Sequence, residues 1–130
     1  MGPLRILIVD DHEVMRGGLR SLLESRPNWE VCGEAATGMD AVEQAKLLRP
    51  DVVVLDISMP GFNGLEAIPL IRKETPRSEV LILSRYEERE MRLKALEAGA
   101  REYIPKSQGL ARDLLAAIDG IVRERTILPG

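Results

Sequence analysis

The chain has 130 residues, of which 45% are hydrophobic and 30% are charged, and its formal net charge is -3. These values are typical of one globular domain that can bury its own core. The mild negative charge, without a basic block, argues against nucleic-acid binding by this segment. No apolar stretch is long enough to span a bilayer, and no secretory signal pattern is present. The single cysteine, Cys32, fits a reducing compartment, and we expect a cytoplasmic protein.

The first half of the chain predicts three strands separated by two helices. A hydrophobic run over residues 4–9 ends on two aspartates, and a second, more polar run covers residues 29–35. A third run, over residues 51–55, is almost entirely valine and leucine and ends on Asp56. Apolar residues at helical spacing follow the first and second runs. These two stripes are Met15, Leu19, Leu22 and Leu23, and then Ala41, Val42, Ala45 and Leu48.

The second half continues the alternation of strands and helices. A run over residues 79–83 ends on Ser84, and a weaker run over residues 101–105 ends on Lys106. The helix expected after Asp56 contains Pro69, which lacks a backbone donor, so we expect a kink or a late helix start there. The stripes of the last two helices are Met91, Ala95 and Ala98, and then Leu110, Leu114, Ile118 and Ile121.

Repeated strand–helix alternation predicts an α/β fold, in which helices cover both faces of a five-stranded parallel sheet. The first, third and fourth strands are nearly continuous in branched apolar residues, as strands buried on both faces are. Charged residues and Pro105 suit the edge of a sheet, so the second and fifth strands belong there. The expected order is the flavodoxin-like 2-1-3-4-5. We expect one domain over residues 1–125, with 126–130 as a tail or the start of a linker.

The carboxyl ends of parallel strands lie along one edge of a sheet, and the ligand crevice of open α/β sheets lies outside that edge. This edge would gather Asp10, Asp11, Asp56, Ser84 and Lys106. Three close carboxylates repel one another, so either one takes a proton or a cation joins them. Magnesium prefers oxygen ligands and shares its shell with phosphate oxygens. The sequence therefore predicts a pocket for magnesium and a phosphoryl group.

The same residues have the chemistry that phosphoryl transfer needs. Asp56 is the candidate nucleophile, because it follows the central strand and a carboxylate can form an aspartyl-phosphate. Lys106 offers a positive charge to the phosphoryl oxygens, and Ser84 offers a hydroxyl donor. Phosphoryl transfer depends mainly on positioning and charge neutralisation, which this set supplies.

With these motifs, the chain resembles a receiver domain of bacterial two-component response regulators. The motifs, in order, are Ile8-Val9-Asp10-Asp11-His12, Leu55-Asp56-Ile57-Ser58-Met59-Pro60, Asn63-Gly64, Leu83-Ser84, and Ala95-Leu96-Glu97-Ala98-Gly99-Ala100 through Tyr103 to Lys106. The Asp-Asp-His opening and Ser84 are most similar to the NarL/LuxR-type regulators. The resemblance implies a signalling switch, not an enzyme that turns over a separate substrate.

The resemblance implies a role for each residue of the pocket. Asp56 would accept a phosphoryl group from a sensor histidine kinase, in a reaction that the domain catalyses itself with Mg²⁺. Asp11, Asp56 and the backbone carbonyl of Ser58 would bind the ion directly, and Asp10 would act largely through water. Lys106 would pair with the carboxylate and then with the phosphate.

The resemblance also implies how the signal leaves the pocket. Ser84 would move toward the phosphate and Tyr103 would turn inward behind it, changing the surface of the fourth helix, fifth strand and fifth helix. Arg85 is bulkier than the small residue that is common there, and we expect it to gate the phosphoryl group. The family type implies homodimerisation on phosphorylation and transcriptional control. DNA would be bound only through a C-terminal helix-turn-helix domain that these residues do not include, and no membrane is implied.

Plainer interpretations stay open for the individual residues. Asp10 or Asp11 could simply cap the first helix, and His12 is expected in the first turn of that helix rather than as a phosphohistidine or ligand. The others could be ordinary strand-end or surface side chains: Ser84, Lys106, Tyr103, and Arg85 paired with Glu88.

Three other functions compete with the switch. A receiver-like domain could signal by contact alone, but the complete set of acidic residues, hydroxyl and lysine argues against it. A haloacid-dehalogenase-type phosphatase needs a second acid two residues after its nucleophile, where this chain has Ser58. A flavodoxin-like flavin carrier needs a Ser/Thr-rich phosphate loop after the first strand, where this chain has Asp11-His12-Glu13.

Overall fold

The structure is a computed structural model that describes residues 2–58, 64–85 and 89–127, and five strands alternate with five helices in these ranges. The strands are β1 (Leu4–Val9), β2 (Trp29–Ala35), β3 (Val52–Asp56), β4 (Glu79–Ser84) and β5 (Glu102–Pro105). The helices are α1 (Glu13–Glu24), α2 (Gly38–Leu48), α3 (Gly64–Glu74), α4 (Arg89–Ala98) and α5 (Leu110–Ile127). None of the described helices has the length and apolar character needed to cross a membrane.

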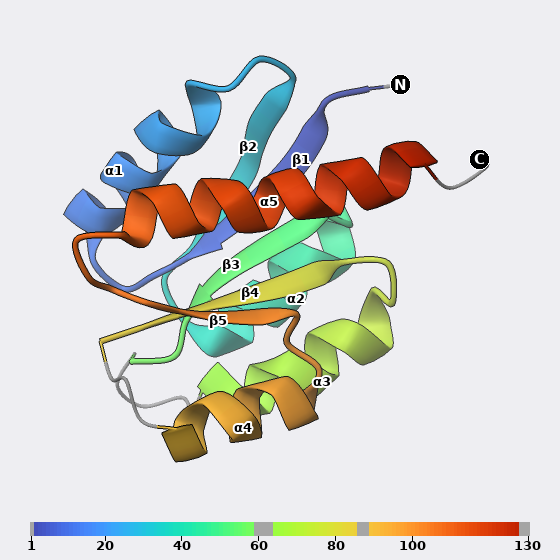
Figure 1. Ribbon diagram of the computed structural model, residues 1–130. Coiled ribbons are helices and arrows are strands. Elements are labelled where there is room, and N and C mark those ends of the chain that lie inside the picture. The colour runs from blue at the N-terminus through green and yellow to red at the C-terminus, as the bar shows by residue number, and fades with distance from the viewer. Residues whose placement is uncertain (1, 59–63, 86–88, 128–130) are drawn as a thin grey trace.

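The five strands form one sheet in the order β2-β1-β3-β4-β5, and every neighbouring pair is parallel (Figure 1). This confirms the order predicted from the sequence. The central strand β3 is buried along its whole length, as its run of valines predicts. The edge strand β2 carries one extra residue, because Ile6 pairs with Val31 and Leu7 pairs with Gly33. Such a bulge is a common feature of edge strands.

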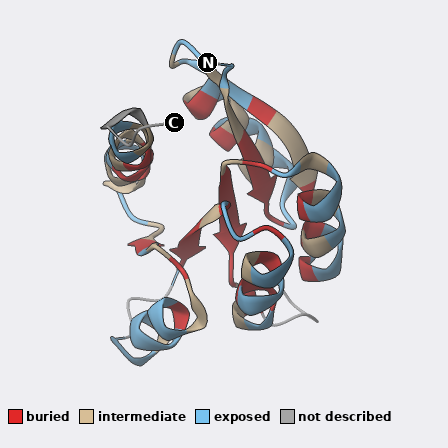
Figure 2. Cartoon of the chain, turned by 90° about the vertical axis from the view of Figure 1, so that its right-hand side faces the viewer, coloured by how far each residue is buried: buried red, intermediate tan, exposed pale blue. Residues whose placement is uncertain are grey.

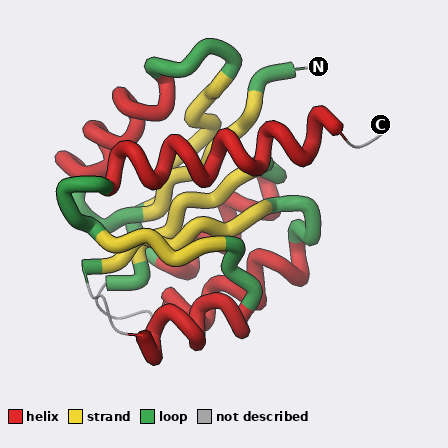
Figure 3. The backbone as a smooth tube through the Cα atoms, in the orientation of Figure 1, coloured by secondary structure: helices red, strands yellow, loops and turns green. Residues whose placement is uncertain are grey.

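Helices cover both faces of the sheet, with α1 and α5 on one face and α2, α3 and α4 on the other (Figure 3). Each face has its own apolar core. Figure 2 shows that the buried residues lie on the strands and on the sides of the helices that face the sheet. Burial of these two apolar layers is the main stabilising contribution to such a fold.

Helix α3 begins at Gly64 and continues through Pro69 to Glu74, so the expected late start of this helix is wrong. Pro69 lies on the exposed side of the helix, whereas Ala67 and Ile68 are buried against the sheet. Burial of that apolar side stabilises the helix in spite of the missing backbone donor. At the other end of the chain, α5 extends to Ile127, and the domain boundary expected at residue 125 stays a prediction.

The start of α3 is packed very tightly against the end of β3. A Cβ atom at Gly64 would lie 2.7 Å from the Cα atom of Ile57, the residue after Asp56. Only glycine allows two backbone segments to approach so closely. This contact fixes one side of the loop that leaves the carboxyl end of the central strand, although residues 59–63 of that loop lie outside the described ranges.

Candidate phosphoacceptor and metal site

The carboxyl edge of the sheet brings together the polar residues that follow four of its strands. Asp10 and Asp11 follow β1, Asp56 ends β3, Ser84 ends β4, and Lys106 follows β5. Parallel pairing of β1, β3, β4 and β5 places these four ends side by side, as the sequence predicted. At the β4–β5 step, the Lys106 backbone N–H donates to the Ser84 carbonyl at 2.7 Å.

Lys106 joins the two buried carboxylates of the site. Its Nζ atom lies 3.1 Å from Asp10 Oδ2 and 3.0 Å from Asp56 Oδ2. Asp10 is 0% exposed and Asp56 is 1% exposed, so each carboxylate needs a partner to stay charged. The alternative of a solvated Lys106 therefore does not hold. One ammonium group bridges the two acids at the position expected for phosphoryl chemistry.

Backbone groups fix the other oxygen of each buried carboxylate. Asp10 Oδ1 accepts from the His12 backbone N–H at 2.9 Å, and Asp56 Oδ1 accepts from the Ser58 backbone N–H at 2.8 Å. These turn-like bonds orient both acids, because an aspartate often binds the backbone two residues further on. His12 is also the N-cap residue of α1, so the alternative in which Asp10 or Asp11 is the N-cap is wrong.

Arg16 on α1 holds the loop that carries the first two acids. Its Nη1 donates to the Asp10 carbonyl at 2.7 Å, and its Nε donates to Glu34 at 2.9 Å. Hydrogen bonds from Arg20 and then Arg16 hold the pKa of the Glu34 carboxyl below its ordinary value. These contacts tie α1 to β2 beside the site. Arg16 was not predicted from the sequence, because the apolar spacing that indicates the first helix does not show which residues its polar side chains contact.

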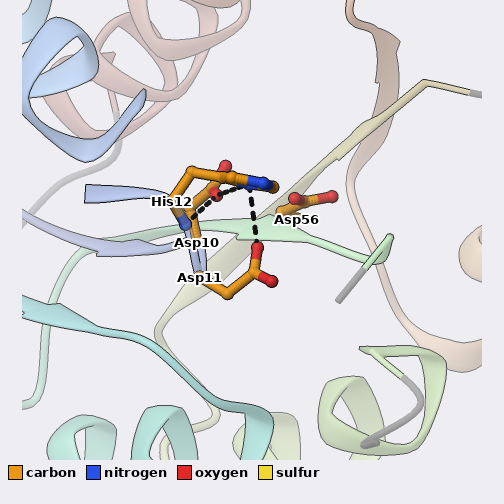
Figure 4. Close-up of side chains that lie close together, drawn as sticks. All are labelled: Asp10, Asp11, His12 and Asp56. Atoms are coloured by element: carbon orange, nitrogen blue, oxygen red, sulfur yellow. Dashed lines mark hydrogen bonds and ion pairs between the residues drawn. The ribbon is translucent and has the colours of Figure 1, made fainter. Parts of the chain in front are cut away.

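Asp11 and His12 complete the acidic cluster (Figure 4). The Asp11 side chain is 28% exposed, and the His12 Nδ1 atom lies 3.0 Å from Asp11 Oδ1 and 3.3 Å from Asp10 Oδ1. One ligand atom from each of Asp10, Asp11, His12 and Asp56 lies within 4.8 Å of the others. His12 precedes the first turn of α1, and its ring faces the acids, which the sequence analysis did not expect.

The charges of this cluster suit a divalent cation. Asp10, Asp11 and Asp56 bring three carboxylates, and Lys106 is the one Lys or Arg that forms an ion pair with them among the described residues. A hard divalent ion with oxygen ligands would offset the remaining negative charge. The Ser58 hydroxyl is also buried without a hydrogen-bond partner among the described residues. The donor set therefore fits magnesium.

The three residues expected to pass on or protect the phosphoryl group lie in different surroundings. Ser84 is fully buried at the end of β4, and Tyr103 is 5% exposed, so neither is a surface side chain. Arg85 is exposed, and Glu88, its alternative partner, lies outside the described residues. Every peptide bond in the described ranges is trans, including those beside Lys106.

The chain matches a known protein family over most of its length. The family described as response regulator receiver domain matches residues 6–119. The chain belongs to this family. Membership excludes the flavin-carrier and haloacid-dehalogenase interpretations and confirms the resemblance found in the motifs.

Two curated relatives show how far the similarity extends. A protein-glutamate methylesterase/protein-glutamine glutaminase of Pyrococcus abyssi is 45% identical over 104 residues, which is 79% of this chain and 28% of that protein. The response regulator protein VraR of Staphylococcus saprophyticus is 37% identical over 116 residues, which is 89% of this chain and 55% of VraR. The chain therefore spans only part of the length of the relatives it matches.

Solved structures agree with the fold and with the NarL/LuxR type. A LuxR-family two-component response regulator from Aurantimonas sp. has a TM-score of 0.88 at 37% identity, covering 95% of this chain and 87% of that one. A CheX–CheY–BeF3–Mg complex from Borrelia burgdorferi has a TM-score of 0.85 at 25% identity, covering 93% of this chain and 90% of that one. The chain is thus a receiver domain of a two-component response regulator.

Proposed function

We propose that this receiver domain is a phosphorylation-activated switch whose phosphoacceptor is Asp56. The observation that carries the proposal is the position of Asp56: it is buried at the end of the central strand, and Lys106 Nζ lies 3.0 Å from its Oδ2. A carboxylate oxygen of Asp56 forms the new bond to phosphorus while the phosphorus–nitrogen bond of a kinase phosphohistidine breaks. The leaving imidazole keeps the electron pair of that bond and takes up a proton.

The proposed cofactor is Mg²⁺, held directly by Asp11, Asp56 and the backbone carbonyl of Ser58, with Asp10 acting largely through water. The charge excess of the cluster supports this assignment, as does the Mg named in the Borrelia burgdorferi complex. When bound, the ion neutralises charge on the carboxylates and on the transferring phosphoryl group. Lys106 contributes a second positive charge beside Asp56.

The proposed output is a change in the surface formed by α4, β5 and α5. In the phosphorylated state the Ser84 hydroxyl donates to a phosphoryl oxygen, and Tyr103 packs behind it, so the phosphoryl group favours one of two conformations. Ser84 is 0% exposed at the end of β4 and Tyr103 is 5% exposed on the adjacent strand β5, and this arrangement supports the assignment. Amide shifts in Tyr103 and α4 on addition of a phosphoryl mimic should be reduced in Ser84→Ala, and a wild-type response would reject this step.

The partners follow from the same proposal. A sensor histidine kinase in the cytoplasm would be the donor, and phosphorylation would promote homodimerisation. Similarity to LuxR-family regulators supports a transcriptional output through a separate helix-turn-helix DNA-binding domain. The Pyrococcus abyssi relative supports a second candidate, an enzymatic output domain. The reading frame after Gly130 decides between them.

Phosphodonor labelling tests the proposed acceptor. The protein is incubated with a small phosphodonor, with and without Mg²⁺, and the label is located by mass spectrometry. We expect one phosphoryl group on Asp56 that depends on magnesium and is lost in Asp56→Asn. Asp51→Asn is the matched control, because Asp51 lies just before the other end of the same strand. Label on another residue, or unchanged labelling of Asp56→Asn, would overturn the proposal.

A further inference from the structure

The ring of His12 lies among the carboxylates of the proposed metal site, and the proposed function gives it no role (Figure 4). Its Nδ1 atom is 3.0 Å from Asp11 Oδ1 and 3.3 Å from Asp10 Oδ1. It is the one nitrogen ligand among the four groups that lie within 4.8 Å of one another. His12 is also the only histidine of the chain.

The local fold leaves this ring available to a ligand. His12 is the N-cap of α1 in an extended conformation, with φ -96° and ψ 115°, and its side chain makes no capping hydrogen bond. The Asp10 carboxylate accepts a hydrogen bond from the His12 backbone N–H at 2.9 Å, and this bond holds the His12 backbone beside the acids. The side chain is 56% exposed, so the ring borders both the acids and solvent.

The distance between the His12 ring and Asp11 is that of neighbouring ligands on one ion. Two ligand atoms that each lie about 2.1 Å from an octahedral ion, at right angles, are separated by about 3.0 Å. The 3.0 Å between His12 Nδ1 and Asp11 Oδ1 matches that value, and Asp11 is the direct ligand of the proposed site that lies beside the ring. The same distance suits a hydrogen bond from the ring to Asp11, and the two possibilities differ in what they predict for metal selectivity.

We propose that His12 Nδ1 is an additional metal ligand that makes this site favour nitrogen-binding divalent ions, such as Mn²⁺, Co²⁺ and Ni²⁺, over Mg²⁺. An imidazole nitrogen adds little to the binding of Mg²⁺, which prefers oxygen. It adds much more along the series from Mn²⁺ to Ni²⁺, for which imidazole is a good ligand. This inference rests on the proposed metal site and adds a residue that sets its selectivity.

The test compares metal affinities of the untagged protein at about pH 8, where an ordinary imidazole is neutral. Mg²⁺, Mn²⁺ and Ni²⁺ are titrated separately by calorimetry into the wild type, His12→Phe and His12→Asn. Phenylalanine keeps a planar ring at this position, and asparagine keeps a favoured N-cap residue for α1. Two different replacements are used so that the comparison does not depend on the folding of one variant. We expect either substitution to weaken Ni²⁺ binding about tenfold or more and Mn²⁺ binding less, while Mg²⁺ affinity changes by less than about twofold.

A spectroscopic experiment on the wild type is independent of any substitution. Pulsed electron paramagnetic resonance of the Mn²⁺-loaded protein, with and without ¹⁵N-labelled histidine, should show a coupling to one imidazole nitrogen, which can only come from His12. Absence of that coupling, or equal loss of all three metals in the His12 variants, would overturn the inference.

Asp11→Asn separates this inference from the proposed function. If Asp11→Asn leaves the affinity for all three metals unchanged, the proposed metal site itself is wrong. If Asp11→Asn abolishes binding while the His12 variants keep the wild-type selectivity, the site stands and only the role of His12 is rejected.

Discussion

The two ends of the sheet carry the same number of clustered carboxylates, but different cationic side chains balance their negative charge. At the amino edge, three arginines meet three acids. Arg125 lies 2.8 Å from Asp51, Arg72 lies 3.1 Å from Glu79, and Arg101 joins Glu79 at 2.8 Å and Glu124 at 2.7 Å. The acids and arginines are Asp51, Glu79 and Glu124, and Arg72, Arg101 and Arg125. Each carboxylate there has a guanidinium partner.

At the carboxyl edge, one lysine serves two of three acids. Lys106 bridges Asp10 and Asp56, and Asp11 contacts the ring of His12. This cluster is more buried than the amino-edge network, because Asp10 and Asp56 are almost fully buried whereas the Glu79 side chain is 23% exposed. Among the described residues no arginine forms an ion pair with these three acids, and their mutual repulsion is offset by the contacts with Lys106 and His12.

This difference in charge balance distinguishes a structural charge network at the amino edge from a binding site at the carboxyl edge. At the amino edge, Arg101 donates hydrogen bonds to Glu124 and then to Glu79, which raise the pKa of Arg101 above its ordinary value, and the same contact lowers the pKa of Glu124. Those charges satisfy one another and link β4, β5 and α5. At the carboxyl edge, the excess negative charge can be offset by a cation and then by the chemistry of phosphoryl transfer.

The largest expected effect is on magnesium binding. Asp11→Asn removes a proposed direct ligand and should weaken Mg²⁺ affinity at least about tenfold. Asp10→Asn should weaken it less, because Asp10 is proposed to act through water. Glu79→Gln, at the amino edge, should leave it unchanged. Affinities are measured by calorimetry, and equal losses in the Asp10 and Asp11 variants would contradict the assignment of direct ligands.

The second prediction concerns the free energy of unfolding. Here a substitution at the amino edge should have a larger effect than one at the carboxyl edge. Arg101→Ala breaks the contacts with Glu79 and Glu124 and should lower the free energy of unfolding by about 1 kcal/mol. Asp11→Asn should leave stability unchanged or raise it slightly without metal, because it relieves repulsion among the acids. Urea unfolding of the metal-free proteins measures both. A larger loss of stability in Asp11→Asn than in Arg101→Ala would mean that the carboxyl-edge acids are structural.

The smallest effect is expected at Arg85, the arginine that follows β4 at the carboxyl edge. It is exposed, unlike the arginines of the amino-edge network, so its side chain is free to lie over the phosphoryl group. Arg85→Ala should shorten the lifetime of the aspartyl-phosphate about twofold, because water then reaches it more easily. The rate of phosphate loss after removal of the donor is compared with the wild type. An equal or longer lifetime in the variant would remove the gating role.

Sequence pattern was sufficient for the features that depend on strand topology. Once runs such as 4–9 and 51–55 are read as parallel strands, the grouping of Asp10, Asp56 and Lys106 follows, because parallel strand ends share one edge. The position of the His12 ring did not follow, since it depends on one side-chain rotamer and on a backbone bond to Asp10.

The features that sequence reasoning missed depend on packing and on partners distant in the chain. Pro69 was expected to kink α3 or to delay its start, and the helix instead begins before Pro69, because burial of Ile68 and its apolar neighbours outweighs the local penalty. The pair Arg101–Glu79 joins the residue before β5 to the first residue of β4, and hydrophobic periodicity carries no information about such ion pairs. Charge partners become visible only when the whole fold is known.

The most direct test of the contrast between the two edges is a magnesium titration followed by amide chemical shifts. We expect saturable shifts at Asp10, Asp11 and Asp56, and then at Lys106, and none at Asp51 or Glu79. Saturable shifts of similar size at Asp51 and Glu79, or no saturable shift at the carboxyl edge, would contradict the claim that only the unbalanced cluster binds a cation.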